Sequence, residues 1–160
     1  MGRVYTNCVS FRPDILVVSP DELTTHLLVE VGSSVADPNR ETSLKHQMIR
    51  MGAPTGLLVT PDWVTVFRDS FKSYAEDSIA RVDQVSTGEI EDLQRFVGRQ
   101  STSEAEFEDA VQNWLDQLKY RLERGYLRGS DLKFRDHLLP ALELGEIRAT
   151  GPRTPRHAAR

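Results

Sequence analysis

The chain has 160 residues, of which 39% are hydrophobic and 28% are charged, with a net charge of −4 and a single cysteine, Cys8. This composition is typical of one soluble globular domain, and one cysteine excludes both an internal disulfide framework and a cysteine-rich zinc site. The lone thiol favours a reducing compartment. Without an apolar run of about 20 residues or an apolar N-terminal stretch, we expect a cytoplasmic protein with no membrane partner.

The negative charge is unevenly distributed along the chain. Residues 69–125 hold 13 acidic and 7 basic side chains, whereas residues 1–68 hold 7 acidic and 6 basic ones. A net negative charge argues mildly against a nucleic-acid partner. That argument does not apply to the first 68 residues, because they are almost neutral.

Short apolar runs rich in Val, Ile and Leu, bounded by Pro, Gly, Asp and Ser, follow one another up to Arg68. Such punctuation is typical of strands. Leu44, Met48 and Met51 recur at helical spacing, which predicts a helix over 40–51. A strand, a helix and a strand in this order favour two neighbouring parallel strands. The predicted strands are 4–9, 12–18, 26–32, 55–60 and 63–68.

Two capping-box patterns open helices in the second half of the chain. Ser86-x-x-Glu89 predicts an amphipathic segment that ends at Gly98, and Ser103-x-x-Glu106 opens the longest helix, about 103–124. The apolar stripe of this longest helix is either core or a surface through which a homodimer forms. The stripe consists of Phe107, Ala110, Val111, Trp114, Leu115, Leu118 and Leu122.

The last elements complete the predicted domain organisation. A short helix is predicted over 131–144 with an interruption at Pro140, because proline breaks helix interiors. The basic, proline-containing end of the chain is predicted to be disordered. We therefore expect an α/β core over 1–70, a helical extension over 71–148 that packs on the core or mediates assembly, and a disordered tail over 149–160.

Two acidic residues, Asp14 and Glu30, lie inside runs that are expected to be buried strands. Side chains alternate between the faces of a strand, so two adjacent strands of a hairpin would place these carboxylates side by side. Unpaired carboxylates at half-buried positions cost on the order of several kcal/mol and repel each other. Because Mg²⁺ takes hard oxygen ligands from one or two carboxylates, the pair predicts a site for Mg²⁺ or Mn²⁺.

Each acid also has a structural explanation. Asp14 follows a proline, and Pro-Asp dipeptides are common at turns. Glu30 is surrounded by apolar residues and disfavoured in a strand, but a buried ion pair with Arg12 or His26 would account for it.

Lys45 is the third candidate site residue. It lies four residues after Glu41, so a surface pair along one helix explains it. It could also point from the helix towards the metal site, where an ammonium would orient the attacking water or stabilise charge on a scissile phosphate. Sequence spacing does not separate these interpretations.

The order of these motifs resembles that of the Uma-type restriction endonucleases, a branch of the PD-(D/E)XK nuclease superfamily. In that branch the motif lysine is supplied by the helix that follows the glutamate strand. This would explain why Gly32 stands at the usual lysine position and would make Lys45 its substitute. The N-terminal nuclease domain of type I restriction subunits has a similar layout. The matching residues are Pro13, Asp14, Glu30–Ser33, Glu41, Lys45, Gly52, Leu57–Asp62 and Val64–Arg68.

The resemblance implies a PD-(D/E)XK mixed central sheet and Mg²⁺-dependent (or Mn²⁺-dependent) hydrolysis of DNA phosphodiester bonds. Asp14 and Glu30 would hold the ion together with the main-chain carbonyl of Val31, and Lys45 would position water. The alternative is a catalytically inactive nuclease-fold module that acts in protein assembly or DNA binding. Departures from the family, such as the missing opening helix, favour this alternative. Most nucleic-acid affinity comes from phosphate contacts, and the candidates for them are Arg12, Arg40, His46 and Arg50.

Overall fold

The computed structural model describes residues 13–32, 38–98 and 103–150. Most strands lie in the first half of the chain, where the described residues form one α-helix, and the other α-helices lie in the second half. In chain order they are β1 (Ile15–Val18), β2 (Thr25–Val31), α2 (Pro38–Met51), β3 (Thr55–Val59), β4 (Trp63–Asp69), β5 (Ile79–Ser86), α3 (Glu104–Arg124), α4 (Leu138–Leu144) and β6 (Glu146–Ala149).

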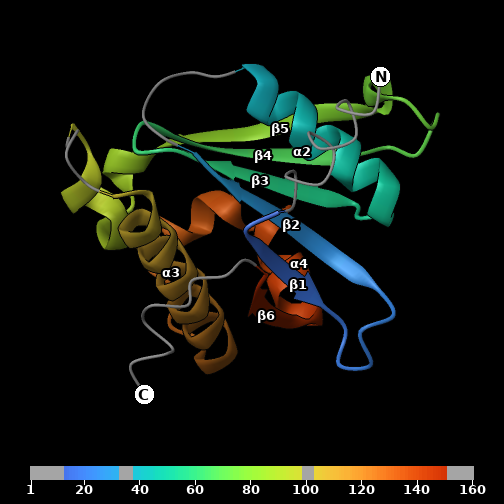
Figure 1. Cartoon of the computed structure of the whole chain (residues 1–160). Coiled ribbons are helices and arrows are strands. Elements are labelled where there is room, and N and C mark those ends of the chain that lie inside the picture. The colour runs from blue at the N-terminus through green and yellow to red at the C-terminus, as the bar shows by residue number, and fades with distance from the viewer. Residues whose placement is uncertain (1–12, 33–37, 99–102, 151–160) are drawn as a thin grey trace.

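The strands form one mixed sheet of six strands in the order β5-β4-β3-β2-β1-β6. Neighbouring strands are antiparallel, except for β2 and β3, which are parallel and are connected by α2. Helix α2 covers one face of the sheet, and α3 and α4 cover the other (Figure 1). The predicted α/β class with a mixed central sheet is thus confirmed. Among the described residues, no helix has the length and apolarity needed to cross a membrane.

The predicted elements of the first 70 residues agree closely with the structure. The predicted strands from residue 12 onward appear as β1 to β4, with ends shifted by up to three residues, and the predicted helix appears as α2. The parallel connection from β2 through α2 to β3 is also as predicted. The predicted strand 4–9 lies outside the described residues.

Helix α2 packs closely on its face of the sheet. Leu44 and Met48 are buried against Leu28 and Phe67. Gly56 of β3 lies directly beneath the helix, where a Cβ atom would come within 2.5 Å of the Met48 sulfur. A glycine at this position therefore lets the helix approach the sheet, which brings the first turns of α2 near the end of β2.

Helix α3 provides the larger core. Its predicted start is confirmed, because the Ser103 side chain accepts a hydrogen bond from the Glu106 N–H, and Gly125 at φ 78° ends the helix. Most of the apolar stripe of α3 is buried between the helix and the six-stranded sheet of the same chain, and Trp114 makes an edge contact with Phe134. This stripe is therefore intramolecular core, and the structure gives no support to a homodimer formed through it.

The segment predicted as a helical extension also supplies strands. β5 pairs with β4 at one edge of the sheet, and β6 pairs with β1 at the other edge. Ser86 ends β5 and makes no side-chain cap, and short 3-10 helices over Thr87–Glu89 and Glu91–Phe96 stand where an amphipathic helix was predicted. Pairing with β4 holds the chain extended as far as Ser86, and this tertiary contact overrides the local capping signal.

Two further predictions at the C-terminal end need correction. Pro140 does not interrupt a helix, because it lies in the first turn of α4, where a backbone N–H has no partner inside the helix. Ala149 is the last residue of β6, and the Thr150 N–H donates to the carbonyl of Asp14 at 3.1 Å. Both residues therefore belong to the fold, and residues 151–160 lie outside the described part of the chain.

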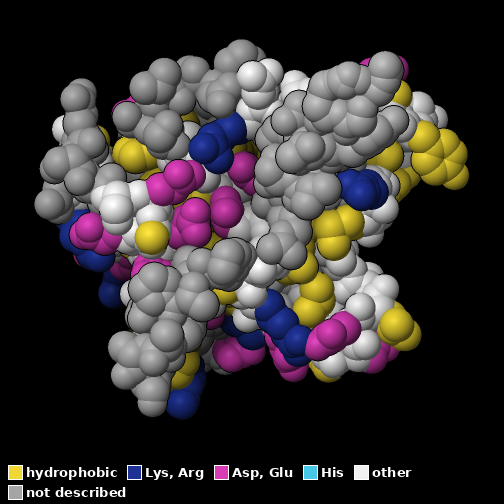
Figure 2. All heavy atoms as spheres, viewed as in Figure 1, with side chains coloured by type: hydrophobic (Ala, Val, Ile, Leu, Met, Phe, Trp, Pro, Cys, Tyr) yellow, Lys and Arg dark blue, Asp and Glu magenta, His cyan; other side chains and the backbone are white. Residues whose placement is uncertain are grey.

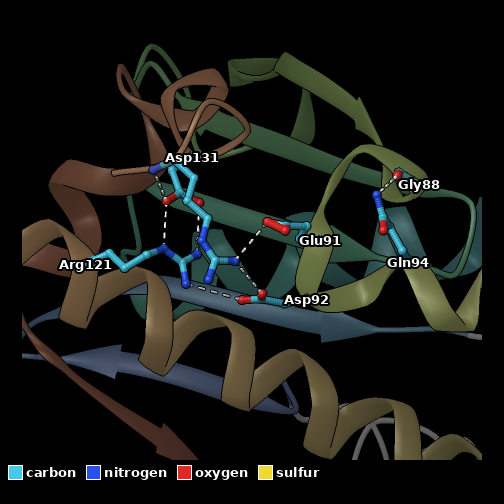
Figure 3. Close-up of polar contacts among 7 residues, drawn as sticks. Gly88, Glu91, Asp92, Gln94, Arg121 and Asp131 are labelled. Carbon is cyan, nitrogen blue, oxygen red and sulfur yellow. Dashed lines mark hydrogen bonds and ion pairs between the residues drawn. The ribbon is translucent and has the colours of Figure 1, made fainter. Parts of the chain in front are cut away.

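A buried ion pair ties α3 to the loop that follows it (Figure 3). The Arg121 guanidinium donates to both carboxylate oxygens of Asp131, at 2.8 and 3.0 Å, and the two side chains are only 4% and 3% exposed. Asp92 lies on the other side of the same guanidinium at 3.6 Å. Burial alone would raise the pKa of Asp131, but the hydrogen bonds and charge of Arg121 hold it below its ordinary value.

Candidate metal centre

Asp14 and Glu30 lie beside each other at one end of the β1–β2 hairpin. In the antiparallel register Ile15 is opposite Val29. The Asp14 N–H donates to the Val29 carbonyl at 2.9 Å, and the Asp14 carboxylate accepts a hydrogen bond from the Val31 N–H at 2.8 Å. These contacts on either side of Glu30 fix the Asp14 carboxylate next to it. The structure thus brings together the two acids that the strand pattern singles out.

The electrostatic surroundings of Glu30 are unfavourable for its charge. Burial is the largest cause that raises the pKa of Glu30 to about 8, and the negative charge of Asp14 raises it further. Arg40 opposes this effect, while Glu108 of α3 adds to it. Because one arginine does not restore an ordinary pKa, Glu30 is mostly protonated at neutral pH, and an additional cation beside it would favour its charged form.

Arg40, in the first turns of α2, is the ion-pair partner of Glu30. Its Nη1 lies 3.0 Å from Glu30 Oε2 and donates to the Val31 carbonyl at 3.1 Å. Its Nη2 lies 3.3 Å from Oε1 of Glu104, in the first turn of α3. A buried ion pair was one predicted explanation for Glu30, but the structure gives it Arg40 as the partner in place of His26. The other predicted partner, Arg12, lies outside the described residues.

Gly32 explains how the Arg40 side chain reaches this position. A Cβ atom at residue 32 would lie 2.8 Å from Cδ and 3.1 Å from Nε of Arg40. The arginine therefore fills the space that any side chain at residue 32 would need. The sequence resemblance places the superfamily lysine at this same position. Gly32 was therefore the sequence signal that a positively charged side chain from another segment of the chain occupies this space.

Lys45 lies on another part of α2. Its Nζ is 3.1 Å from Oε2 of Glu41 and 5.6 Å from the ring centroid of Phe67 on β4. Arg81 of β5 binds the same Glu41 carboxylate at 2.8 Å. Burial alone would raise the pKa of Glu41, but hydrogen bonds from Lys45 and Arg81 hold it below its ordinary value. The structure therefore contains the predicted Glu41–Lys45 pair, and it places Lys45 over β4, two strands from β2.

The remaining predicted phosphate contacts are spread over α2. His46 Nε2 lies 2.9 Å from Oε2 of Glu76, and Arg50 is exposed near the end of the helix. Arg12 lies outside the described residues. On the face shown in Figure 2, acidic side chains gather near the centre, and Lys and Arg side chains are scattered around them. This face therefore offers a place for a small cation more readily than a broad surface for phosphates.

The donor set fits a hard divalent ion. It comprises the carboxylates of Asp14 and Glu30 and the carbonyl of Val31, and Mg²⁺ is commonly held by one or two carboxylates with waters that complete its octahedron. Within the described residues, no group of three or more His, Cys, Asp or Glu side chains is arranged to hold a metal ion. A site of this kind would therefore depend on the main chain and on water for its other ligands.

Comparison with known proteins identifies no family. No protein-family model, curated protein or solved structure matches this chain. The interpretation of the site therefore depends on its own geometry.

Proposed function

We propose that the chain is a metal-dependent DNA endonuclease of the PD-(D/E)XK type, which hydrolyses phosphodiester bonds. The observation that carries the proposal is the pair of adjacent carboxylates, Asp14 and Glu30, with burial and mutual repulsion that raise the pKa of Glu30 to about 8. Paired carboxylates with strongly shifted pKa values are typical of functional sites. Strand β1, which begins directly after Asp14, the strand of Glu30, a helix and a parallel strand also follow in the order that the motif resemblance implies.

The residues of the site have separate roles in this proposal. Mg²⁺ or Mn²⁺ would activate water and neutralise charge on the scissile phosphate. Glu30 would bind the ion in its deprotonated form, and Asp14, fixed by the Val31 N–H, would supply the second carboxylate. Lys45 lies over β4 in a pair with Glu41, and it would have to leave this pair and extend towards β2 to orient water or to contact the phosphate.

Millimolar Mg²⁺ or Mn²⁺ is expected to raise the melting temperature of the wild-type protein. A ligand that binds only the folded state stabilises it by about 2.7 kcal/mol at a concentration one hundred times Kd. Glu30→Gln is expected to lose most of this response, because an amide is a poor ligand for these ions. The measurement is thermal unfolding over a series of metal concentrations, with Glu143→Gln, an exposed acid of α4, as the matched control. An unchanged wild-type melting curve in millimolar Mn²⁺ would contradict the metal site.

The purified protein is expected to nick plasmid DNA slowly in Mg²⁺ or Mn²⁺. Lys45→Ala is expected to lower the rate by about a hundredfold or more while the thermal response to metal stays intact, because an interaction made only in the transition state affects the rate. Lys133→Ala, which removes an exposed lysine paired with Glu89, serves as the control. A Lys45→Ala protein as active as the wild type would show that Lys45 has no catalytic role and is only the surface partner of Glu41.

A specific observation favours the second candidate, a catalytically inactive nuclease-fold module that acts in protein assembly or DNA binding. Arg40 contacts two of the proposed metal ligands, Glu30 and Val31, and Lys45 is paired with Glu41 over another strand. An internal cation of this kind could replace the metal ion permanently. Absence of nicking on single- and double-stranded DNA with both metals, in a protein that unfolds cooperatively, would make this second candidate the better account.

A further inference from the structure

We infer that Arg40 is an internal competitor of the metal ion: its guanidinium occupies Glu30 and the Val31 carbonyl, and it shifts onto Glu104 when an ion binds. The inference rests on the proposed metal site and adds a means of regulating it. The site would then have two states, one closed by the arginine and one open to the ion.

The competition follows from shared ligands. Nη1 of Arg40 is within hydrogen-bond distance of both Glu30 Oε2 and the Val31 carbonyl oxygen. These are two of the three groups proposed to hold the ion. An ion bound about 2.1 Å from these oxygens would bring a second positive charge next to the guanidinium, so the ion and Arg40 repel each other and compete for the same ligands.

Glu104 offers the arginine a second position. It already accepts a hydrogen bond from Nη2 at 3.3 Å, and its side chain is 53% exposed. The Arg40 side chain is itself 29% exposed, so it can rotate towards Glu104 without unpacking the core. After the shift Arg40 would be paired with Glu104, and Glu30 would be paired with the metal ion. The shift therefore leaves no buried charge without a partner.

Gly32 provides a way to move Arg40 without removing its charge. The Cβ of an alanine at this position would lie 2.8 Å from the Arg40 Cδ, a distance at which the side chain must shift. Gly32→Ala should therefore push the guanidinium away from Glu30, whereas Arg40→Gln removes the positive charge altogether. The two substitutions test the same competition by independent routes.

The test is isothermal titration calorimetry with Mg²⁺ at pH 9 on the wild type, Arg40→Gln, Gly32→Ala and Arg50→Gln. The high pH keeps Glu30 of the wild type, with its pKa of about 8, mostly ionised. Arg40→Gln removes a charge that lowers this pKa, so proton competition in that variant acts against the expected tighter binding, whereas Gly32→Ala keeps the charge. We expect both site variants to bind Mg²⁺ about tenfold more tightly, since a charge-assisted hydrogen bond is worth about that factor or more. Arg50→Gln, which removes an exposed arginine from the same helix, should bind as the wild type does.

The pattern of Mg²⁺ binding across the four proteins shows whether the competition, the proposed metal-dependent function, or both are wrong. Tighter binding by either site variant, with Arg50→Gln unchanged, supports the competition. If the wild type binds Mg²⁺ and neither site variant binds it more tightly, the competition is wrong and the metal site stands. If only the site variants bind Mg²⁺, Arg40 closes the site and the metal-dependent function of the wild type is wrong. If no protein binds Mg²⁺, both are wrong.

Discussion

Replacing Asp131 by alanine is expected to lower the free energy of unfolding by about 3–5 kcal/mol, because the change removes the hydrogen-bonded partner of a buried guanidinium and leaves it only Asp92, at 3.6 Å. Arg121 is 4% exposed and loses both of its short hydrogen bonds to the carboxylate. The backbone N–H of Arg128 also loses its acceptor. The measurement is equilibrium unfolding in urea at neutral pH, followed by circular dichroism.

Arg128→Ala is the matched control for this network. It removes ion pairs to Glu91 and Asp92, but the Arg128 side chain is 46% exposed and the Arg121–Asp131 pair stays in place. Exposed pairs of this kind contribute about 1 kcal/mol or less. Equal losses of unfolding free energy in the two variants would show that the buried Arg121–Asp131 pair stabilises the protein no more than the exposed pairs of Arg128 do.

The free energy of unfolding of the metal-free protein is expected to fall by roughly 2–4 kcal/mol between pH 5 and pH 9 because of Glu30 alone. The folded state raises the pKa of this carboxyl from 4.5 to about 8. A raised folded pKa means that the folded state holds the proton more tightly, so this stabilisation is full below about pH 4.5 and is lost as the pH rises through 8. The range is set below the full value of the shift, because the side chain remains 14% exposed.

Glu30→Gln isolates this contribution, since an amide does not titrate. In EDTA, the wild type is expected to become less stable than the variant as the pH rises from 5 to 9, whereas Glu143→Gln should follow the wild type. Parallel pH profiles for the wild type and Glu30→Gln would mean that Arg40 fully compensates the buried charge. Together with the loss of the metal response, a more stable Glu30→Gln protein would show that this residue is kept for function at a cost in stability.

The local sequence determined most of the elements of the first 70 residues. Short apolar runs predicted the strands β1 and β2. Side chains alternate between the two faces of a strand, and this alternation predicted that Asp14 lies beside Glu30. The helical spacing that begins at Leu44 predicted α2, and the capping box at Ser103 predicted the start of α3. These signals act within a few residues, so one sequence suffices to recognise them.

Only the tertiary structure decided which positively charged side chain pairs with Glu30 and which strands form the two edges of the sheet. Arg40 approaches Glu30 because α2 packs tightly over Gly56 and because Gly32 leaves space for its side chain. Its second partner, Glu104, comes from a helix far along the chain. β5 forms one edge by pairing with β4, against a helical signal at Ser86, and β6 forms the other edge by pairing with β1, a strand from the opposite end of the described chain. Contacts of this kind depend on how whole elements pack, and no local pattern of residues specifies them.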